Sequence, residues 1–539
     1  MRKNSESLLE TVSRIGLAIP LIIALAAFLF LVRMELLGFT NIASEIDQYY
    51  FSACAVRGLD LGQIPIAACH DNKGPLIYLL YEIVFTLAGA YNFLAIKSVA
   101  LGLLLLDIAL LSWTAFRLAG SAAAAMTAAL MLLGLSSDVA FLAFKTELAG
   151  GIFLTAALLV LSAPQAGRSA SRLALAGLFV GVAVTAKQLY AFSGFAVIVW
   201  LFLSQPVRSF QTFGKFLVRS LLFGGFVLVP FALFWLAFAR QNNSADYFAS
   251  FFLYPSVYGS SGGGGLANIL RRTAAVMAGL TDHTLLVLMT AAAAVTFIIA
   301  KPSRNSAGAG FSDPRWLFIL VVLFLLTALI MSPVWFAYYV VLLVGPMVLL
   351  SGTIFGDWWD HVRQISARAA ATFIIVFCVG SMLVATRTWQ TNGMRDIEAV
   401  PARPIAAPSA DASMRYAYEF GEQPDFYAAG HYIPASSIQF PWALPGTPER
   451  WSYKRPAPGT FVARMLAADQ ARNLAQLYAD FARTPPSYVM LQSDFVRNAN
   501  SPNAIDIPGF QDYLDRHCHL LKQAELRPAV SASLYGCSG

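Results

Sequence analysis

Long apolar runs alternate with short polar segments along most of the chain. A helix needs roughly 20 apolar residues to cross a bilayer core about 30 Å thick, and such runs recur up to residue 386. The candidate segments lie near 15–36, 76–90, 93–115, 120–137, 148–163, 172–186, 189–204, 217–239, 275–300, 315–332, 334–351 and 370–386. The pattern therefore predicts an α-helical polytopic membrane protein over residues 1–386.

Residues 387–539 follow a different pattern. They contain no apolar run long enough to span a bilayer, and Pro, Arg, Asp, Gln and Tyr are common among them. The stretch SYVMLQ at 487–492 predicts a β-strand, and PGFQDYL at 508–514 predicts the start of a helix. Alternation of strand and helix predicts a small C-terminal α/β domain.

Composition agrees with this division. The chain is 58% hydrophobic and only 12% charged, whereas soluble domains carry about 25% charged residues. The net charge of +7 arises largely from short basic loops between apolar runs, and the sequence contains no nucleic-acid-binding motif. The first apolar run is too long for a signal-peptide core and has no small-residue cleavage site after it, so we expect it to remain as a span.

The basic loops predict the orientation of the chain. They lie near residue 117 and at 168–172, 208–219, 301–304 and 363–368. If every apolar segment crosses and the basic N-terminus is cytoplasmic, all these loops fall outside, against the positive-inside rule. The segment 76–90 is short and contains Glu82. Placing it at the outer interface as an amphipathic helix reverses every later loop. We therefore predict about eleven spans and an external C-terminal domain.

Two pairs of cysteines fall in regions predicted to be external. Cys54 and Cys69 lie in the first external loop, and Cys518 and Cys537 lie near the C-terminus. Paired cysteines outside the cytoplasm favour two disulfides in an oxidising compartment, with free thiols as the alternative.

One charged residue, Asp107, lies within a predicted span. We expect it to face the bundle interior, because a charge that faces lipid is costly.

The first external loop, with its flanking interfacial segment at 37–92, concentrates residues suited to chemistry. Glu45 and Asp47 lie shortly after the first span, and Lys73 precedes the segment 76–90. A carboxylate at the surface can act as a general base, and a lysine can hold a phosphate as a point charge. The combination favours chemistry on a lipid-linked phosphate; the alternative is a solvated loop with ordinary surface charges.

A second external loop is predicted at 240–272. It contains four consecutive glycines at 262–265, which leave the backbone unrestrained and suit either a mobile flap or a plain flexible linker. Arg271 and Arg272 follow the glycines and could hold a phosphate, but only their position suggests this role.

The first loop resembles that of the GT-C glycosyltransferases. Asp47 is followed by the pair Tyr49 and Tyr50, then by a small-residue helix ending in Gly, and then by NKGPLIY at 72–78. The pattern is most similar to the bacterial branch that includes lipid A aminoarabinose transferases and protein O-mannosyltransferase-like enzymes. The resemblance implies a GT-C fold with juxtamembrane helices and inverting transfer of one sugar from a polyprenyl-phosphate donor.

The resemblance also implies roles for individual residues. Asp47 matches the catalytic carboxylate, although the usual Asp-Glu pair is Asp47-Gln48 here, and Glu45 remains a rival base. Glu147 matches a second acidic residue at the outer end of a later span, with a helix N-terminal Glu favoured by the dipole as the alternative. The residues expected to bind the donor phosphate or substrate are Lys73, Lys187, Gln188, Tyr50, Arg271, Arg272 and Tyr339.

The implied partners are a polyprenyl-phosphate sugar donor, a glycan, lipid or protein acceptor, and the bilayer. The implied location is the bacterial inner membrane, with a cytoplasmic N-terminus and a periplasmic C-terminal domain. No cluster of ligands in the sequence requires a metal, and dependence on a divalent cation is left open. Two other functions remain: a transporter or flippase for lipid-linked sugars, and an oligosaccharide ligase or polymerase.

Overall fold

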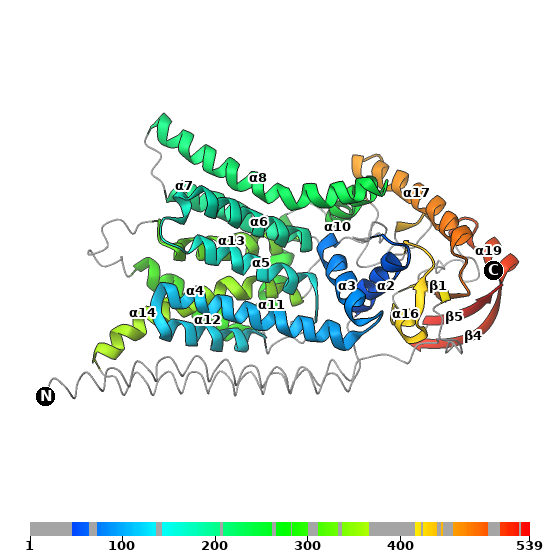
Figure 1. Cartoon of the computed structure of the whole chain (residues 1–539), viewed down its shortest axis with the longest axis horizontal. Helices are drawn as coiled ribbons and strands as arrows, with labels where there is room; N and C mark the ends of the chain where they lie inside the picture. Colours follow the sequence, from blue (N-terminus) through cyan, green and yellow to red (C-terminus); the bar gives the residue numbers. More distant parts are fainter. Residues whose placement is uncertain are drawn as a thin grey trace.

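A computed structural model shows a helical bundle with a mixed β-sheet beyond one end (Figure 1). It describes residues 46–63, 73–135, 143–204, 209–260, 266–281, 283–299, 311–332, 337–365, 415–421, 424–438, 443–445, 456–493, 507–527 and 530–538. The predicted spans at 15–36 and 370–386 lie outside this part of the chain, as do Glu45 and Cys69. The count of about eleven spans therefore stays a prediction.

The bundle helices run along the long axis of the molecule in Figure 1. They are α4 (Phe93–Leu135), α5 (Thr146–Leu161), α6 (Ala170–Ala186), α7 (Ala191–Leu203), α8 (Phe210–Arg240), α11 (Leu266–Thr281), α12 (Thr284–Ile299), α13 (Pro314–Met331) and α14 (Val341–Ile365). Within the described residues, four stretches are long and apolar enough to cross a membrane: Phe93–Gly120, Phe210–Arg240, Pro314–Met331 and Val341–Trp359. This agrees with a membrane protein.

The predicted division between the segments 93–115 and 120–137 is present inside α4. Ala119 and Gly120 have non-helical backbone angles and separate its two helical parts. Gly120 has φ +82°, a conformation that glycine adopts without a steric penalty. The predicted segment 334–351 differs, because α14 begins only at Val341, after the short helix η5 (Ala337–Val340).

Two helices lie between the bundle and the C-terminal sheet (Figure 1): α2 (Ile46–Asp60) and α3 (Pro75–Ala88). Helix α3 begins at Pro75, whose fixed φ suits a first helical position, and ends before Gly89. Its 14 residues extend about 21 Å, less than the roughly 30 Å of a bilayer core. Figure 1 shows α3 at the end of the bundle, in agreement with the placement that the loop charges predict for the segment 76–90.

The predicted loop 240–272 is mostly helical, contrary to expectation. It contains α9 (Ser244–Phe248), the π-helix η4 (Ala249–Leu253) and α10 (Tyr254–Ser260), and the next helix, α11, begins at Leu266. Tertiary contacts hold this segment in place: the buried Tyr254 hydroxyl donates to Asp469 at 2.6 Å. The four glycines at 262–265 lie outside the described residues.

The C-terminal part forms a five-stranded sheet in the order β2-β1-β3-β5-β4. Its strands are β1 (Arg415–Phe420), β2 (Tyr432–Pro434), β3 (Tyr488–Gln492), β4 (Cys518–Arg527) and β5 (Val530–Cys537). The first three are parallel, while β5 pairs antiparallel with both β3 and β4. The accompanying helices are α16 (Asp425–Gly430), α17 (Phe461–Arg483) and α19 (Phe510–His517). The predicted strand and helix appear as β3 and α19.

The cysteine predictions are confirmed where they can be observed. Cys518 and Cys537 form a disulfide that joins the start of β4 to the end of β5. Cys54, in the middle of α2, is also disulfide-bonded. Its expected partner Cys69 lies outside the described residues.

Candidate active site

Asp47 and Lys73 approach each other because of how α2 and α3 begin. Asp47 lies in the first turn of α2, where a carboxylate is stabilised by the helix dipole. Lys73 precedes Gly74, and a Cβ added to Gly74 would lie 1.8 Å from the backbone oxygen of Thr185. Only glycine therefore lets the start of α3 pack this closely against the end of α6, which brings Lys73 toward Lys187.

The helix pair α5 and α6 supplies the other charged groups. Lys145 is the extended residue just before α5, and Glu147 lies in the first turn of that helix. Lys187 follows the last residue of α6, immediately before the short helix η3 (Gln188–Tyr190). Because α5 packs against α6, the three side chains meet at the same end of the bundle.

Asp47 faces two lysines. Its Oδ2 lies 3.9 Å from the Nζ of Lys73 and 3.9 Å from the Nζ of Lys145. The side chain of Asp47 is 23% exposed, whereas Lys145 is only 2% exposed. Lys73 is 17% exposed. Asp47 and Lys73 are thus the partly accessible members of the cluster, whereas Lys145 is buried beside them.

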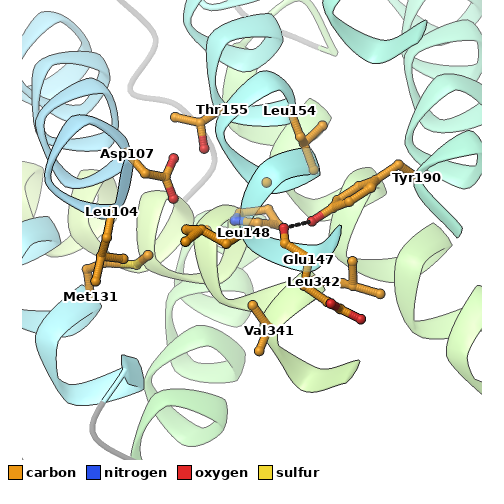
Figure 2. A pocket seen from close by; sticks show the side chains of 13 residues that line it. Leu104, Asp107, Met131, Glu147, Leu148, Leu154, Thr155, Tyr190, Val341 and Leu342 are labelled. Atoms are coloured by element: carbon orange, nitrogen blue, oxygen red, sulfur yellow. Dashed lines mark hydrogen bonds between the residues drawn. The ribbon is translucent and has the colours of Figure 1, made fainter. Parts of the chain in front are cut away.

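Glu147 and Lys187 form a buried ion pair. The Thr146 hydroxyl donates to Oε2 of Glu147 at 2.9 Å. The Tyr190 hydroxyl donates to the Glu147 backbone carbonyl at 2.7 Å (Figure 2). The Nζ of Lys187 also lies 3.7 Å above the ring of Tyr339, a favourable cation–π distance. Both carboxylate oxygens of Glu147 therefore have partners within the protein.

The cluster carries an excess of positive charge. Lys73, Lys145 and Lys187 contribute three positive charges, and Asp47 and Glu147 contribute two negative ones, which leaves +1. A net charge this deep attracts an anion more strongly than it would in water, because the surroundings screen it less. Burial lowers the pKa of Lys145 and of Lys187 to about 8, although the carboxylate of Glu147 opposes the shift.

A small cavity adjoins this cluster, on the side of Glu147 toward the bundle interior (Figure 2). Its volume is about 30 Å³, which is enough for an ordered water, since one needs roughly 10–15 Å³ on this measure. Asp107 lines it and is 5% exposed, which confirms that this residue faces the interior of the bundle. Thr155 also lines it (Figure 2).

The structure places the remaining predicted residues at different distances from the cluster. Gln188 directly follows Lys187 and is half-buried. Arg272 donates weakly to the carbonyl of Met331 at 3.4 Å, and its helix α11 packs against η5, which carries Tyr339. Arg271 is exposed on the same helix. The Tyr50 hydroxyl donates to the carbonyl of Gly421, so it contacts the C-terminal sheet.

Sequence reasoning gave no role to Lys145, the most deeply buried lysine of the cluster. A weak signal existed, because Lys145 stands directly before Thr146 and Glu147 at the start of an apolar run. Nothing in that pattern showed that the residue would lie beside Asp47, nearly a hundred positions earlier. Only the packing of α2 against α3, and of α3 against α5 and α6, brings them together.

Neither a scan against protein-family models nor a search of curated proteins finds a match. Solved structures do match. ArnT from Cupriavidus metallidurans bound to undecaprenyl phosphate has a TM-score of 0.55 at 12% identity, covering 97% of this chain and 97% of that chain. The oligosaccharyltransferase AglB from Archaeoglobus fulgidus, with an inhibitory peptide and a dolichol-phosphate, has a TM-score of 0.46 at 12% identity, covering 88% and 69%. The likeness to ArnT shows that this chain has the fold of the GT-C membrane glycosyltransferases.

Proposed function

We propose that this chain is a membrane glycosyltransferase that moves one sugar from a polyprenyl-phosphate donor to an acceptor, with inversion at the anomeric carbon. The observation that carries the proposal is the accessible carboxylate of Asp47 beside two lysines, one of them buried. A cluster of lysines suits a phosphate, and a partly exposed carboxylate beside it suits deprotonation of an acceptor. The GT-C fold supports the same reaction class.

In the proposed reaction, Asp47 accepts the proton of an acceptor hydroxyl or amine. The freed electron pair attacks the anomeric carbon, and the bond from that carbon to the phosphate oxygen breaks. The polyprenyl phosphate leaves with the bonding electrons, so negative charge grows on its oxygen. Lys73 and Lys145 lie where they can stabilise this charge as it develops. Each ammonium has three donors and can contact a carboxylate and a phosphate oxygen together.

Asp47 suits the role of base better than Glu147. The Glu147 side chain is 5% exposed and is engaged by Lys187 and Thr146. That arrangement suits a group that fixes Lys187 in place, whereas the 23% exposed carboxylate of Asp47 can reach an incoming acceptor. Glu45 lies outside the described residues. Separate mutation of Glu45 and of Asp47 therefore decides which of the two is the general base.

We further propose that the protein works in the bacterial inner membrane, with a cytoplasmic N-terminus and a periplasmic C-terminal domain. Two observations support this location: the Cys518–Cys537 disulfide fits an oxidising compartment, and the basic loops fit the positive-inside rule. The acceptor is then a periplasmic glycan, lipid or protein. The phosphate-binding lysines and Asp47 would lie at the periplasmic end of the bundle.

A panel of donors tests the reaction class. Purified protein in lipid nanodiscs is incubated with undecaprenyl-phosphate single sugars or with undecaprenyl-pyrophosphate oligosaccharides. An extract of cell-envelope lipids, glycans and peptides supplies acceptors. Mass spectrometry should find one added sugar on an acceptor, together with free undecaprenyl phosphate, for a single-sugar donor. Transfer of whole oligosaccharides, or no transfer from any donor, would contradict the proposal.

A further inference from the structure

The helix that carries the proposed base is also the main contact between the bundle and the C-terminal sheet. Helix α2 has Asp47 in its first turn and Arg57 in its last turn. Ten residues of helix span about 15 Å, so the two side chains act at opposite ends of one rigid element. Helix α2 packs against α16 and β2 of the C-terminal part.

The side chain of Arg57 is a buried cation that contacts the C-terminal part of the chain. Its side chain is 1% exposed, and Nη2 lies 3.0 Å from Oδ2 of Asp480, which is also 1% exposed. Its Nη1 donates to the backbone carbonyl of Pro434 at 2.6 Å. A buried ion pair is stabilising only with good geometry and further hydrogen bonds, and losing one partner leaves an uncompensated charge.

Asp480 is held tightly from its own side. Its Oδ2 accepts hydrogen bonds from the Ser436 hydroxyl at 3.0 Å and from the Ser437 backbone amide at 3.0 Å. Its Oδ1 accepts from Gln476 at 2.8 Å and from Arg483 at 3.0 Å. The carboxylate that accepts from Arg57 is therefore held by α17 and by the residues that follow β2.

Two further bonds fix the same helix. The Tyr416 hydroxyl of β1 donates to Asp60 at the end of α2, with a distance of 2.5 Å. The Tyr50 hydroxyl, one turn from Asp47, donates to the carbonyl of Gly421 at 2.9 Å. The C-terminal part thus holds α2 at both ends, whereas Lys145 and Lys187 belong to the bundle.

We propose that Arg57 and Asp480 are positioning residues that set the placement of Asp47 against the lysines of the bundle. The C-terminal domain is then part of the catalytic unit, and it acts through α2. This inference rests on the proposed function, because it assigns these residues to the same reaction. A displacement of about 1 Å at a reacting group can cost about 100-fold in rate, so a loosened α2 lowers the rate without removing any group from the site.

The test separates positioning from folding. Arg57→Gln and Asp480→Asn break the pair from either side, and Arg57→Lys keeps the charge. Arg483→Gln is the matched control, since Arg483 is 54% exposed and contacts only Oδ1 of Asp480, so its loss leaves the partners of Oδ2, including Arg57 of α2. For each variant, purified monodisperse protein is assayed for single-turnover rate, for affinity toward undecaprenyl phosphate, and for hydrogen exchange in α2 by mass spectrometry.

We expect Arg57→Gln and Asp480→Asn to lower the single-turnover rate at least tenfold. Their dissociation constants for undecaprenyl phosphate should stay within twofold, and α2 should exchange faster. Arg57→Lys should recover most of the rate, and Arg483→Gln should match the wild type. An unchanged rate per folded molecule in Asp480→Asn, or an equal loss of rate and phosphate affinity, overturns the inference. If wild-type protein transfers no sugar, the proposed function fails, and α2 exchange still decides whether the pair holds the helix.

Discussion

The ammonium of Lys145 is buried and lies 3.9 Å from the carboxylate of Asp47. Burial lowers the pKa of Lys145 and of Lys187 to about 8, so both are charged below that pH and lose their protons above it. We predict that the dissociation constant for undecaprenyl phosphate rises about tenfold between pH 7 and pH 9, a change of roughly 1.4 kcal/mol. Isothermal titration in nanodiscs measures it.

Arginine provides the control for this pH dependence. The variant with both Lys145→Arg and Lys187→Arg stays protonated over the whole range, because a guanidinium keeps its proton well above pH 9. Its affinity for undecaprenyl phosphate should change much less between pH 7 and pH 9. A wild-type affinity that is flat over this range would exclude the two lysines as titrating phosphate ligands.

The buried ion pair between Glu147 and Lys187 should contribute to the stability of the folded protein. Lys187→Gln removes the nearest counter-ion of the buried Glu147 and leaves only the more distant charges of Lys145 and Lys73; breaking a buried pair costs about 3–5 kcal/mol. The double variant that also carries Glu147→Gln removes the orphaned charge, so it should be more stable than Lys187→Gln alone. Thermal unfolding in detergent ranks the three proteins. A single variant as stable as the wild type would contradict the buried pair.

At the scale of elements, the close contact between α3 and α6 depends on Gly74. An alanine there would place its Cβ 1.8 Å from the backbone oxygen of Thr185, so α3 must move and carry Lys73 with it. We predict that Gly74→Ala lowers both the unfolding temperature and the affinity for undecaprenyl phosphate. Gly224→Ala in α8 is the control, because no atom lies within 4 Å of its added Cβ. If Gly74→Ala and Gly224→Ala had the same unfolding temperature and the same affinity for undecaprenyl phosphate, the role of this contact would be refuted.

Several elements could be predicted from the sequence because a single pattern in the sequence was enough to predict each one. The strand β3 and the helix α19 follow from local patterning, and the placement of 76–90 at the end of the bundle follows from loop charges. The helices between Ser244 and Ser260 could not be predicted, since bonds such as Tyr254 to Asp469 stabilise them from distant sequence. Lys145 was missed for the same reason, as its neighbour Asp47 is remote in the chain.

At the scale of the whole molecule, the candidate site lies where the bundle meets α2 and α3, beside the C-terminal sheet (Figure 1). One continuous apolar core includes Phe51 of α2, Leu148 of the bundle, and Tyr432 of the sheet. The Tyr91 hydroxyl adds a direct bond to the carbonyl of Tyr432 at 2.7 Å. We therefore expect the bundle and the C-terminal sheet to move together, so that a structural change in either one alters the candidate site.

The central claim is that Asp47 is the base of a sugar transfer at this cluster of lysines. Single-turnover transfer from the accepted polyprenyl-phosphate sugar, compared between the wild type and Asp47→Asn, tests it most directly. General-base catalysis contributes about 10²–10⁴-fold, so the variant should lose at least a hundredfold in rate while it folds and binds undecaprenyl phosphate normally. Transfer by Asp47→Asn at the wild-type rate would contradict the account.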